Sequence, residues 1–197
     1  MSKTYVINKR TLITEKVAFL GYEFTLKLSS TRDSIDYLYG ITDEKIKKYE
    51  NKIRFLIDKI NKEGNLKKMQ LALKISCSRV VYCNRKTNTW VSRGIIQNYC
   101  MLSKYCDRLD SKTESFLKNT YIDIFNTLGI KIPGYLYSHR YKLIESLKKN
   151  KTIIFNSKIG VKDNDLKILH STICGPATSE DYDYLVMRIL KELRIGY

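Results

Sequence analysis

Cysteines, histidines and paired carboxylates are the residues of this chain that could bind a metal or perform acid–base chemistry. The five cysteines stand at positions 77, 83, 100, 106 and 174, and the first four form two pairs with a spacing of six. Structural zinc sites favour tighter pairs, so this spacing favours buried thiols over zinc ligands. His139 and His170 have no ligand pair near them in sequence. We therefore expect neither histidine to bind a metal or to act as a base.

Acidic residues are paired at Asp163 and Asp165 and again in the segment Ser179–Asp183. Carboxylates that converge on magnesium serve two-metal phosphoryl transfer. Here, however, each cluster borders an expected helix or turn, where acidic residues cap helices and interact with the helix dipole. The glycine-rich phosphate loop is also absent. We expect no complete catalytic site and no cofactor in this chain.

Positive charge is the strongest signal in the sequence. Lysine and arginine total 36 against 20 aspartates and glutamates, which gives a net charge of +16 and a pI near 9.6. Self-repulsion of this size disfavours a compact state unless a polyanion offsets it. Nucleic acid is the partner we favour; an anionic membrane surface and a compositional bias of the genome are the alternatives.

One window of the chain carries basic side chains without any acidic ones. No carboxylate lies between Glu63 and Asp107, and this window also holds Trp90, the only tryptophan. Cations for phosphates and aromatic rings for bases are typical of a surface for single strands or hybrid duplexes. Burial of the rings in the core is the alternative. The basic residues of the window are Lys67, Lys68, Lys74, Arg79, Arg85, Lys86, Arg93 and Lys104.

Length and hydrophobicity limit the classes of protein to which the chain can belong. Its 197 residues, 43% of them hydrophobic, can bury the core of one elongated domain or of two compact subdomains. No apolar run approaches the ~20 residues that span a bilayer, and the N-terminus lacks the apolar core of a signal peptide. These features predict a cytoplasmic protein with reduced thiols and no membrane partner.

Hydrophobic periodicity predicts a mainly α fold, with a small N-terminal β-hairpin followed by a basic helical bundle. Residues Val17–Leu28 are expected to form a strand with a bulge or a close backbone approach at Gly21, paired with Tyr5–Ile13. A turn-rich connection is expected over Ser29–Tyr39. The other expected elements are helices at Thr42–Asn61, Leu66–Tyr82, Ile95–Leu109, Ser111–Leu128 (with a capping box at Ser111 and Glu114), Ser138–Lys149 and Ser179–Leu193, a hairpin turn at Asn84–Thr89, and a strand at Thr152–Phe155.

The N-terminal segment carries a resemblance to a known family. Asn8-Lys9-Arg10-Thr11, followed by Phe19-Leu20-Gly21-Tyr22-Glu23-Phe24, resembles the segment after the catalytic site in bacterial reverse transcriptases of the group II intron and retron type. In that family the corresponding strand lies at the palm–thumb junction beside the primer terminus, and a basic helical thumb follows. The resemblance implies a junction over residues 1–40, a thumb-like region over 41–130 and a helical extension over 131–197.

The catalytic motif of that family, Tyr-x-Asp-Asp, is absent. The nearest strings, Ser34–Tyr37 and Asp181–Tyr184, lack adjacent aspartates. The resemblance therefore implies that the fingers, most of the palm and its magnesium ions would belong to other sequence. It also implies RNA or an RNA–DNA hybrid as partner and no small-molecule ligand.

The hypothesis is thus a C-terminal fragment or subunit of a reverse transcriptase that holds primer–template. A stand-alone nucleic-acid-binding protein of a mobile element or phage is the first alternative, and a helical adaptor for an acidic protein is the second. Lysine residues on the exposed face of the helix Thr42–Asn61 extend the basic surface, and Phe55 among them is expected either to stack on a sugar or base or to dock against a neighbouring element. The predicted nucleic-acid-binding residues are Gly21, Tyr22, Lys48, Lys52, Phe55, Lys59, Lys67, Lys68, Lys74, Arg79, Arg85, Lys86, Trp90 and Arg93.

Overall fold

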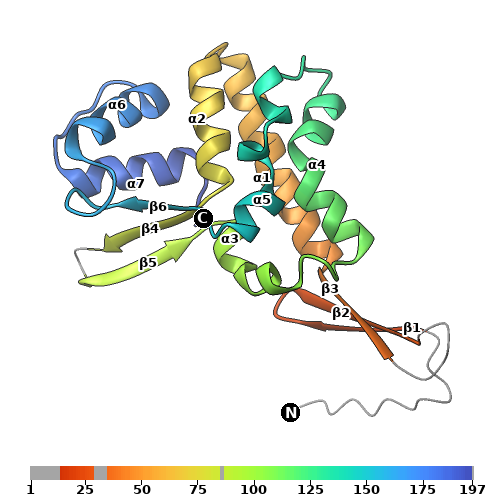
Figure 1. The fold of residues 1–197 in the computed structure, drawn as a ribbon. Coiled ribbons are helices and arrows are strands. Elements are labelled where there is room, and N and C mark those ends of the chain that lie inside the picture. The colour runs from red at the N-terminus through yellow and green to blue at the C-terminus, as the bar shows by residue number, and fades with distance from the viewer. Residues whose placement is uncertain (1–13, 29–34, 85–86, 197) are drawn as a thin grey trace.

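The computed structural model describes residues 14–28, 35–84 and 87–196 (Figure 1). Helices dominate this part of the chain, as expected, and two three-stranded sheets accompany them. The second sheet consists of the expected hairpin and the expected strand at Thr152–Phe155, which the sequence did not predict to pair. No helix within the described ranges is long and apolar enough to cross a membrane.

The N-terminal sheet is an antiparallel meander of β1 (Thr14–Phe19), β2 (Tyr22–Leu28) and β3 (Ile35–Ile41). Leu20 and Gly21 connect β1 to β2 with φ of 50° and 86°. Two-residue hairpin turns of this kind require positive φ at both positions. The expectation of one continuous strand was therefore wrong, because the turn divides the segment into two strands. Of the two alternatives at Gly21, the structure shows a close approach, since a Cβ atom there would lie 3.0 Å from Lys45 Cγ.

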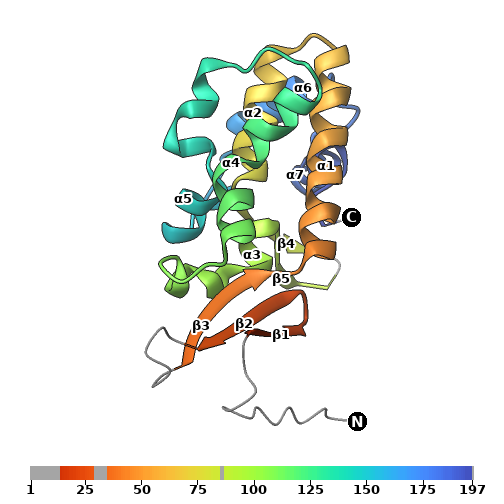
Figure 2. The same cartoon turned by 90° about the vertical axis from the view of Figure 1, so that its right-hand side faces the viewer.

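Two further expectations for the N-terminal region concern the pairing segment and the connection after β2. The pairing segment at residues 5–13 lies outside the described residues. The connection expected up to Tyr39 was wrong in its second part, because β3 occupies it and pairs with β2 in full register from Tyr22–Ile41 to Leu28–Ile35. Both views place this sheet at one end of the helical part (Figure 2).

Three long helices form the centre: α1 (Asp43–Lys62), α2 (Leu66–Ser76) and α4 (Ser111–Thr127). The expected helix over Thr42–Asn61 is confirmed by α1, which begins with two acidic residues and buries isoleucines at helical spacing. The expected helix from Leu66 ends at Ser76 instead of Tyr82, because the residues beyond it form a strand. The expected N-terminus of α4 is displaced by one residue, since Asp110 is the N-cap and accepts from the backbone N–H of Thr113 at 2.8 Å.

Short helices replace the other expected ones. The single helix expected over Ile95–Leu109 is a short α3 (Ile95–Asn98) followed by a 3-10 helix at Cys100–Tyr105. The one expected over Ser138–Lys149 consists of a 3-10 turn and α5 (Leu143–Lys148). Non-helical backbone angles at Tyr99 (φ −121°, ψ 23°) and at Lys142 (φ −96°, ψ 126°) interrupt both periodic patterns.

The second sheet has the order β5-β4-β6, with β4 (Arg79–Asn84), β5 (Thr89–Arg93) and β6 (Thr152–Phe155). The β4–β5 hairpin and the strand β6 are confirmed, and β6 pairs with β4 in parallel. Helices α6 (Asp163–Cys174), which the sequence did not predict, and α7 (Tyr182–Glu192) lie beside this sheet (Figure 1). The hydrophobic core is one cluster that includes residues of α1, α2, α4, α5, α6 and α7.

Candidate nucleic-acid interface

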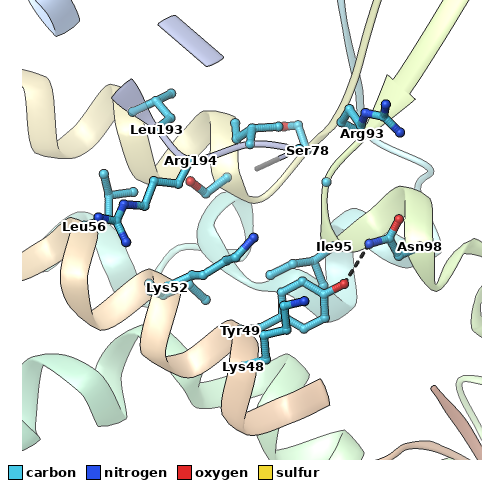
Figure 3. A pocket seen from close by; sticks show the side chains of 15 residues that line it. Lys48, Tyr49, Lys52, Leu56, Ser78, Arg93, Ile95, Asn98, Leu193 and Arg194 are labelled. Atoms are coloured by element: carbon cyan, nitrogen blue, oxygen red, sulfur yellow. Dashed lines mark hydrogen bonds between the residues drawn. The ribbon is translucent and has the colours of Figure 1, made fainter. Parts of the chain in front are cut away.

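A groove lies between the exposed side of α1, the junction of β5 with α3, and the segment that follows α7 (Figure 3). Its volume is about 320 Å³. Among the described residues, four basic side chains line it, Lys48, Lys52, Arg93 and Arg194, and no acidic side chain does. We call this feature the basic groove. Polar groups of Ser76, Ser78 and Asn98 and apolar groups of α1, α3 and the last segment complete its lining.

Helix α1 brings two of the four cations together. Lys48 and Lys52 are one turn apart, so they share a face of the helix. Ile53, Leu56, Ile57 and Ile60 of the same helix are buried and hold α1 on the core. The lysines are therefore carried by a rigid element, with their ammonium groups toward the groove.

The junction of β5 with α3 positions the third cation. Arg93 ends β5, and Gly94 follows with a φ of 110°. A Cβ atom at Gly94 would lie 2.8 Å from the carbonyl oxygen of Ser78, so a larger residue would separate the two segments. Glycine here permits the close passage that brings Arg93 beside Ser78 in the groove.

The segment after α7 supplies the fourth cation. Leu193 and Ile195 are buried, which fixes this segment on the core, and Arg194 between them is exposed. Its guanidinium carbon lies 3.4 Å from the centroid of the Phe55 ring on α1, a cation–π contact. Among the described residues, Lys48, Arg93 and Arg194 form no ion pair with a carboxylate.

The groove concentrates positive charge. Burial lowers the pKa of Lys52, and the nearby cations Lys48 and Arg194 lower it further. Both effects disfavour the charged form of a lysine. An anion in the groove would relieve them, because it would offset the mutual repulsion of the cations.

A second hollow of about 620 Å³ continues from the groove and shares Lys52 and Arg194 with it. Its one carboxylate, Glu192, accepts from Lys59 at 2.6 Å and from Lys68 at 3.0 Å. Burial would raise the pKa of Glu192, but the two lysines outweigh this effect and lower it. The carboxylate is thus neutralised by a structural network that ties α7 to α1 and α2.

An aromatic cluster anchors the β1–β2 turn next to the groove. The Tyr22 hydroxyl donates to the carbonyl of Asn98 at 2.9 Å, and the Asn98 amide donates to the Tyr49 hydroxyl at 2.7 Å. The Tyr99 ring makes edge contacts with both tyrosines. Asn98 thus links the hairpin to α1 and contributes to the groove lining.

The structure brings together some of the predicted binding residues and separates others. Lys48, Lys52 and Arg93 line the groove, and Phe55 and Lys59 line the adjoining hollow. Gly21 and Tyr22 line neither, but the Tyr22 hydroxyl donates to the carbonyl of Asn98 in the groove lining. The rest lie elsewhere: Lys67 and Lys74 are exposed on α2, Arg79 and Trp90 are on the second sheet, and Arg85 and Lys86 lie outside the described residues.

Lys68 differs from the other predicted residues because it is buried. Its ammonium group lies 2.7 Å from Glu63 and 3.0 Å from Glu192, and its side chain is 8% exposed. We therefore leave it out of the interface. Arg194, Asn98, Ser76 and Ser78 were not anticipated. Arg194 comes from a segment with balanced charge, so no pattern in the sequence points to it.

The residue types that could bind metal do not gather within the described ranges. No group of three histidine, cysteine or acidic side chains there could hold a metal ion. Cys77 is buried, and burial raises the pKa of its thiol to about 12. The other four cysteines are partly exposed, and all five are free thiols.

No protein-family model matches the sequence, and neither the curated proteins nor the solved structures that were compared gave a match.

Proposed function

We propose that this chain binds the backbone of a nucleic acid in the basic groove, as the palm-end and thumb part of a reverse transcriptase that holds an RNA–DNA hybrid. The observation that carries the proposal is the convergence of four cations from three distant segments on one hollow that no acidic side chain of the described residues lines. A polyphosphate backbone satisfies such a surface at several points at once.

The position of the β1–β2 turn supports the reverse-transcriptase part of the proposal. This turn carries the Leu20-Gly21 pair on which the family resemblance depends, and the Gly21 carbonyl accepts from Thr42 at the start of α1 at 3.0 Å. The turn is therefore held at the end of the helix that carries Lys48 and Lys52. In the proposed enzyme, the catalytic aspartates and their magnesium ions come from other sequence, and this chain positions the hybrid.

Binding of a labelled RNA–DNA hybrid, measured by fluorescence anisotropy over a salt series, tests the groove. We expect the logarithm of the affinity to fall linearly with the logarithm of salt, with a slope of about 0.9 per phosphate contact. The double variant Lys48→Gln/Lys52→Gln should weaken binding by at least about tenfold at low salt and reduce the slope by about two.

A matched pair controls for the loss of charge alone. Lys131 and Lys158 are exposed and line neither the groove nor the adjoining hollow. Lys131→Gln/Lys158→Gln removes the same charge and should leave the slope nearly unchanged. Equal weakening by both pairs, or binding that does not depend on salt, would contradict the proposal.

Two further observations separate the proposal from its alternatives. A reading frame for Tyr-x-Asp-Asp in the genomic neighbourhood would support the reverse transcriptase, whereas its absence together with hybrid binding would favour a stand-alone binding protein. An acidic protein partner that is retained after nuclease treatment, without any affinity for hybrid, would favour the adaptor.

A further inference from the structure

The two faces of the second sheet differ in burial. Side chains alternate between the faces along each strand, and directly paired residues share a face. One face contains Val80 and Phe155, which are 0% and 2% exposed. This face belongs to the hydrophobic core, and α7 borders it at Tyr82.

The opposite face contains no buried side chain. Val81 pairs with Ser92 and with Ile154, and Cys83 pairs with Trp90, so these residues lie on that side together with Arg79. All are half-buried except Trp90, which is 55% exposed. We call this surface, made of Arg79, Val81, Cys83, Trp90, Ser92 and Ile154, the open sheet face.

A cation is held in place on the same face as the exposed ring. Arg79 Nε donates to Ser92 Oγ at 2.9 Å, and Ser92 Oγ donates to Gln97 Oε1 at 2.7 Å. These bonds use one N–H of the guanidinium and orient the group. Within the described ranges, Arg79 forms no ion pair, and the carboxylate-free window of the sequence contains both strands of the hairpin.

We propose that the open sheet face binds an unpaired segment of nucleic acid, with a base stacked on Trp90 and a phosphate at Arg79. Aromatic residues flanked by cations bind single strands in this way, because an unpaired nucleotide offers both a free base face for stacking and a backbone phosphate for the cation. Bases inside a duplex are already stacked on one another. The proposal rests on the proposed function, and it adds a single-strand site to the groove that holds the hybrid.

The strand β5 connects the two surfaces. Arg93 in the groove is three residues from Trp90, about 10 Å at ~3.3 Å per residue, and the two side chains lie on opposite faces of the sheet. Because β5 is the edge strand of this sheet, a strand that leaves the hybrid in the groove reaches the open sheet face by passing around β5. Arg79 has the same sign of charge as the groove cations, so one continuous polyanion can contact both; the carboxylates of Asp181 and Asp183 lie around a separate hollow at Cys83.

The emission of Trp90 reports directly on this site, because the chain has no other tryptophan. Titration with an oligouridine of about 12 nucleotides should quench this emission, whereas a blunt-ended hybrid should leave most of it unchanged at saturation. In parallel, anisotropy of the labelled oligouridine should show affinity losses of roughly 5- to 150-fold for Trp90→Ala and a smaller loss for Trp90→Phe. Arg79→Gln should weaken binding several-fold. Tyr137→Ala serves as control, since Tyr137 is also an exposed aromatic residue, at 61%, and should bind like the wild type.

The outcomes separate this proposal from the function proposed for the groove. Oligouridine binding without quenching, equal quenching by the hybrid, or wild-type affinity of Trp90→Ala would overturn the single-strand site. Quenching by oligouridine together with unaltered hybrid binding by Lys48→Gln/Lys52→Gln would retain this site and overturn the groove. Absence of binding to either nucleic acid would overturn both.

Discussion

The guanidinium of Arg194 lies on the ring of Phe55, 3.4 Å from its centroid, and joins the last segment of the chain to the middle of α1. Phe55 is 46% exposed, and the sequence placed it among the residues that could stack on nucleic acid. In the structure the ring faces a cation of the same chain. Its expected role is therefore to position Arg194 at the junction of the basic groove and the adjoining hollow.

Replacement of the Phe55 ring should weaken hybrid binding by a small factor. Exposed cation–π contacts contribute about 0.5–1 kcal/mol, so Phe55→Leu should lose roughly two- to fivefold in affinity. Phe55→Tyr keeps an aromatic face and should retain binding. Anisotropy with the labelled hybrid measures both, with Tyr137→Leu as the control. Wild-type affinity of Phe55→Leu would show that the ring does not position Arg194.

Lys68 should contribute to stability instead of binding. Lys68→Met leaves Glu63 and part of Glu192 without their partner, and charged hydrogen bonds of this kind contribute about 1–3 kcal/mol. Urea unfolding should show this loss for Lys68→Met, whereas Lys67→Met, at the exposed neighbouring position, should change stability by less than about 0.5 kcal/mol. A Lys68→Met protein that is fully stable but binds hybrid poorly would restore the original prediction of phosphate binding.

Gly21 should tolerate substitution less well than Gly129. Both have positive φ, 86° and 65°, so alanine is strained at either position. At Gly21 a Cβ atom would also lie 3.0 Å from Lys45 Cγ and 3.1 Å from the Tyr99 hydroxyl, whereas at Gly129 nothing lies within 4 Å. We expect about 1–3 kcal/mol of destabilisation for Gly21→Ala and less for Gly129→Ala, both measured by urea unfolding. Equal losses would mean that the contact with Lys45 and Tyr99 relaxes without cost.

The stability of the fold should depend on the protonation of His170. This side chain is 1% exposed in α6, and burial, with a further contribution from Arg188 on α7, lowers its pKa. As the pH falls below about 6.5, the unfolded chain takes up a proton that the folded chain resists, so this group makes stability decrease toward acidic pH. The loss from this single group is at most about 1.4 kcal/mol per pH unit.

The pH effect can be isolated because the chain has two histidines. Melting temperatures between pH 7.5 and pH 5 should fall less steeply in His170→Gln than in the wild type, even if the variant is less stable at neutral pH. His139→Gln, at an exposed position, should follow the wild-type profile. Parallel profiles for all three proteins would exclude His170 as a source of the pH dependence.

The sequence by itself determined the elements that depend on local spacing. Helix α1 could be predicted because its buried residues recur at three- and four-residue steps behind an acidic first turn, and the strand Thr152–Phe155 because of its short β-branched run. The excess of cations and the window without carboxylates are also properties of the sequence alone. The positive charge of the sequence alone predicted Lys48, Lys52 and Arg93 as binding residues.

Only the tertiary structure decided which of these cations share a surface. Lys68 shares a face of α2 with the buried Ala72 and Ile75, whereas Lys67 shares one with the exposed Lys74. The carboxylate of Glu192 that pairs with Lys68 is on a helix more than a hundred residues away, so only long-range packing shows that this lysine is neutralised. Long-range packing also explains why the sequence did not reveal Arg194. This residue reaches the groove because its neighbours Leu193 and Ile195 are buried in the core. The parallel pairing of β4 with β6 likewise joins segments distant in sequence, and local periodicity carries no information about such pairings. Residue types and helical faces were thus set locally, whereas the basic groove and the open sheet face exist only once distant segments have packed together.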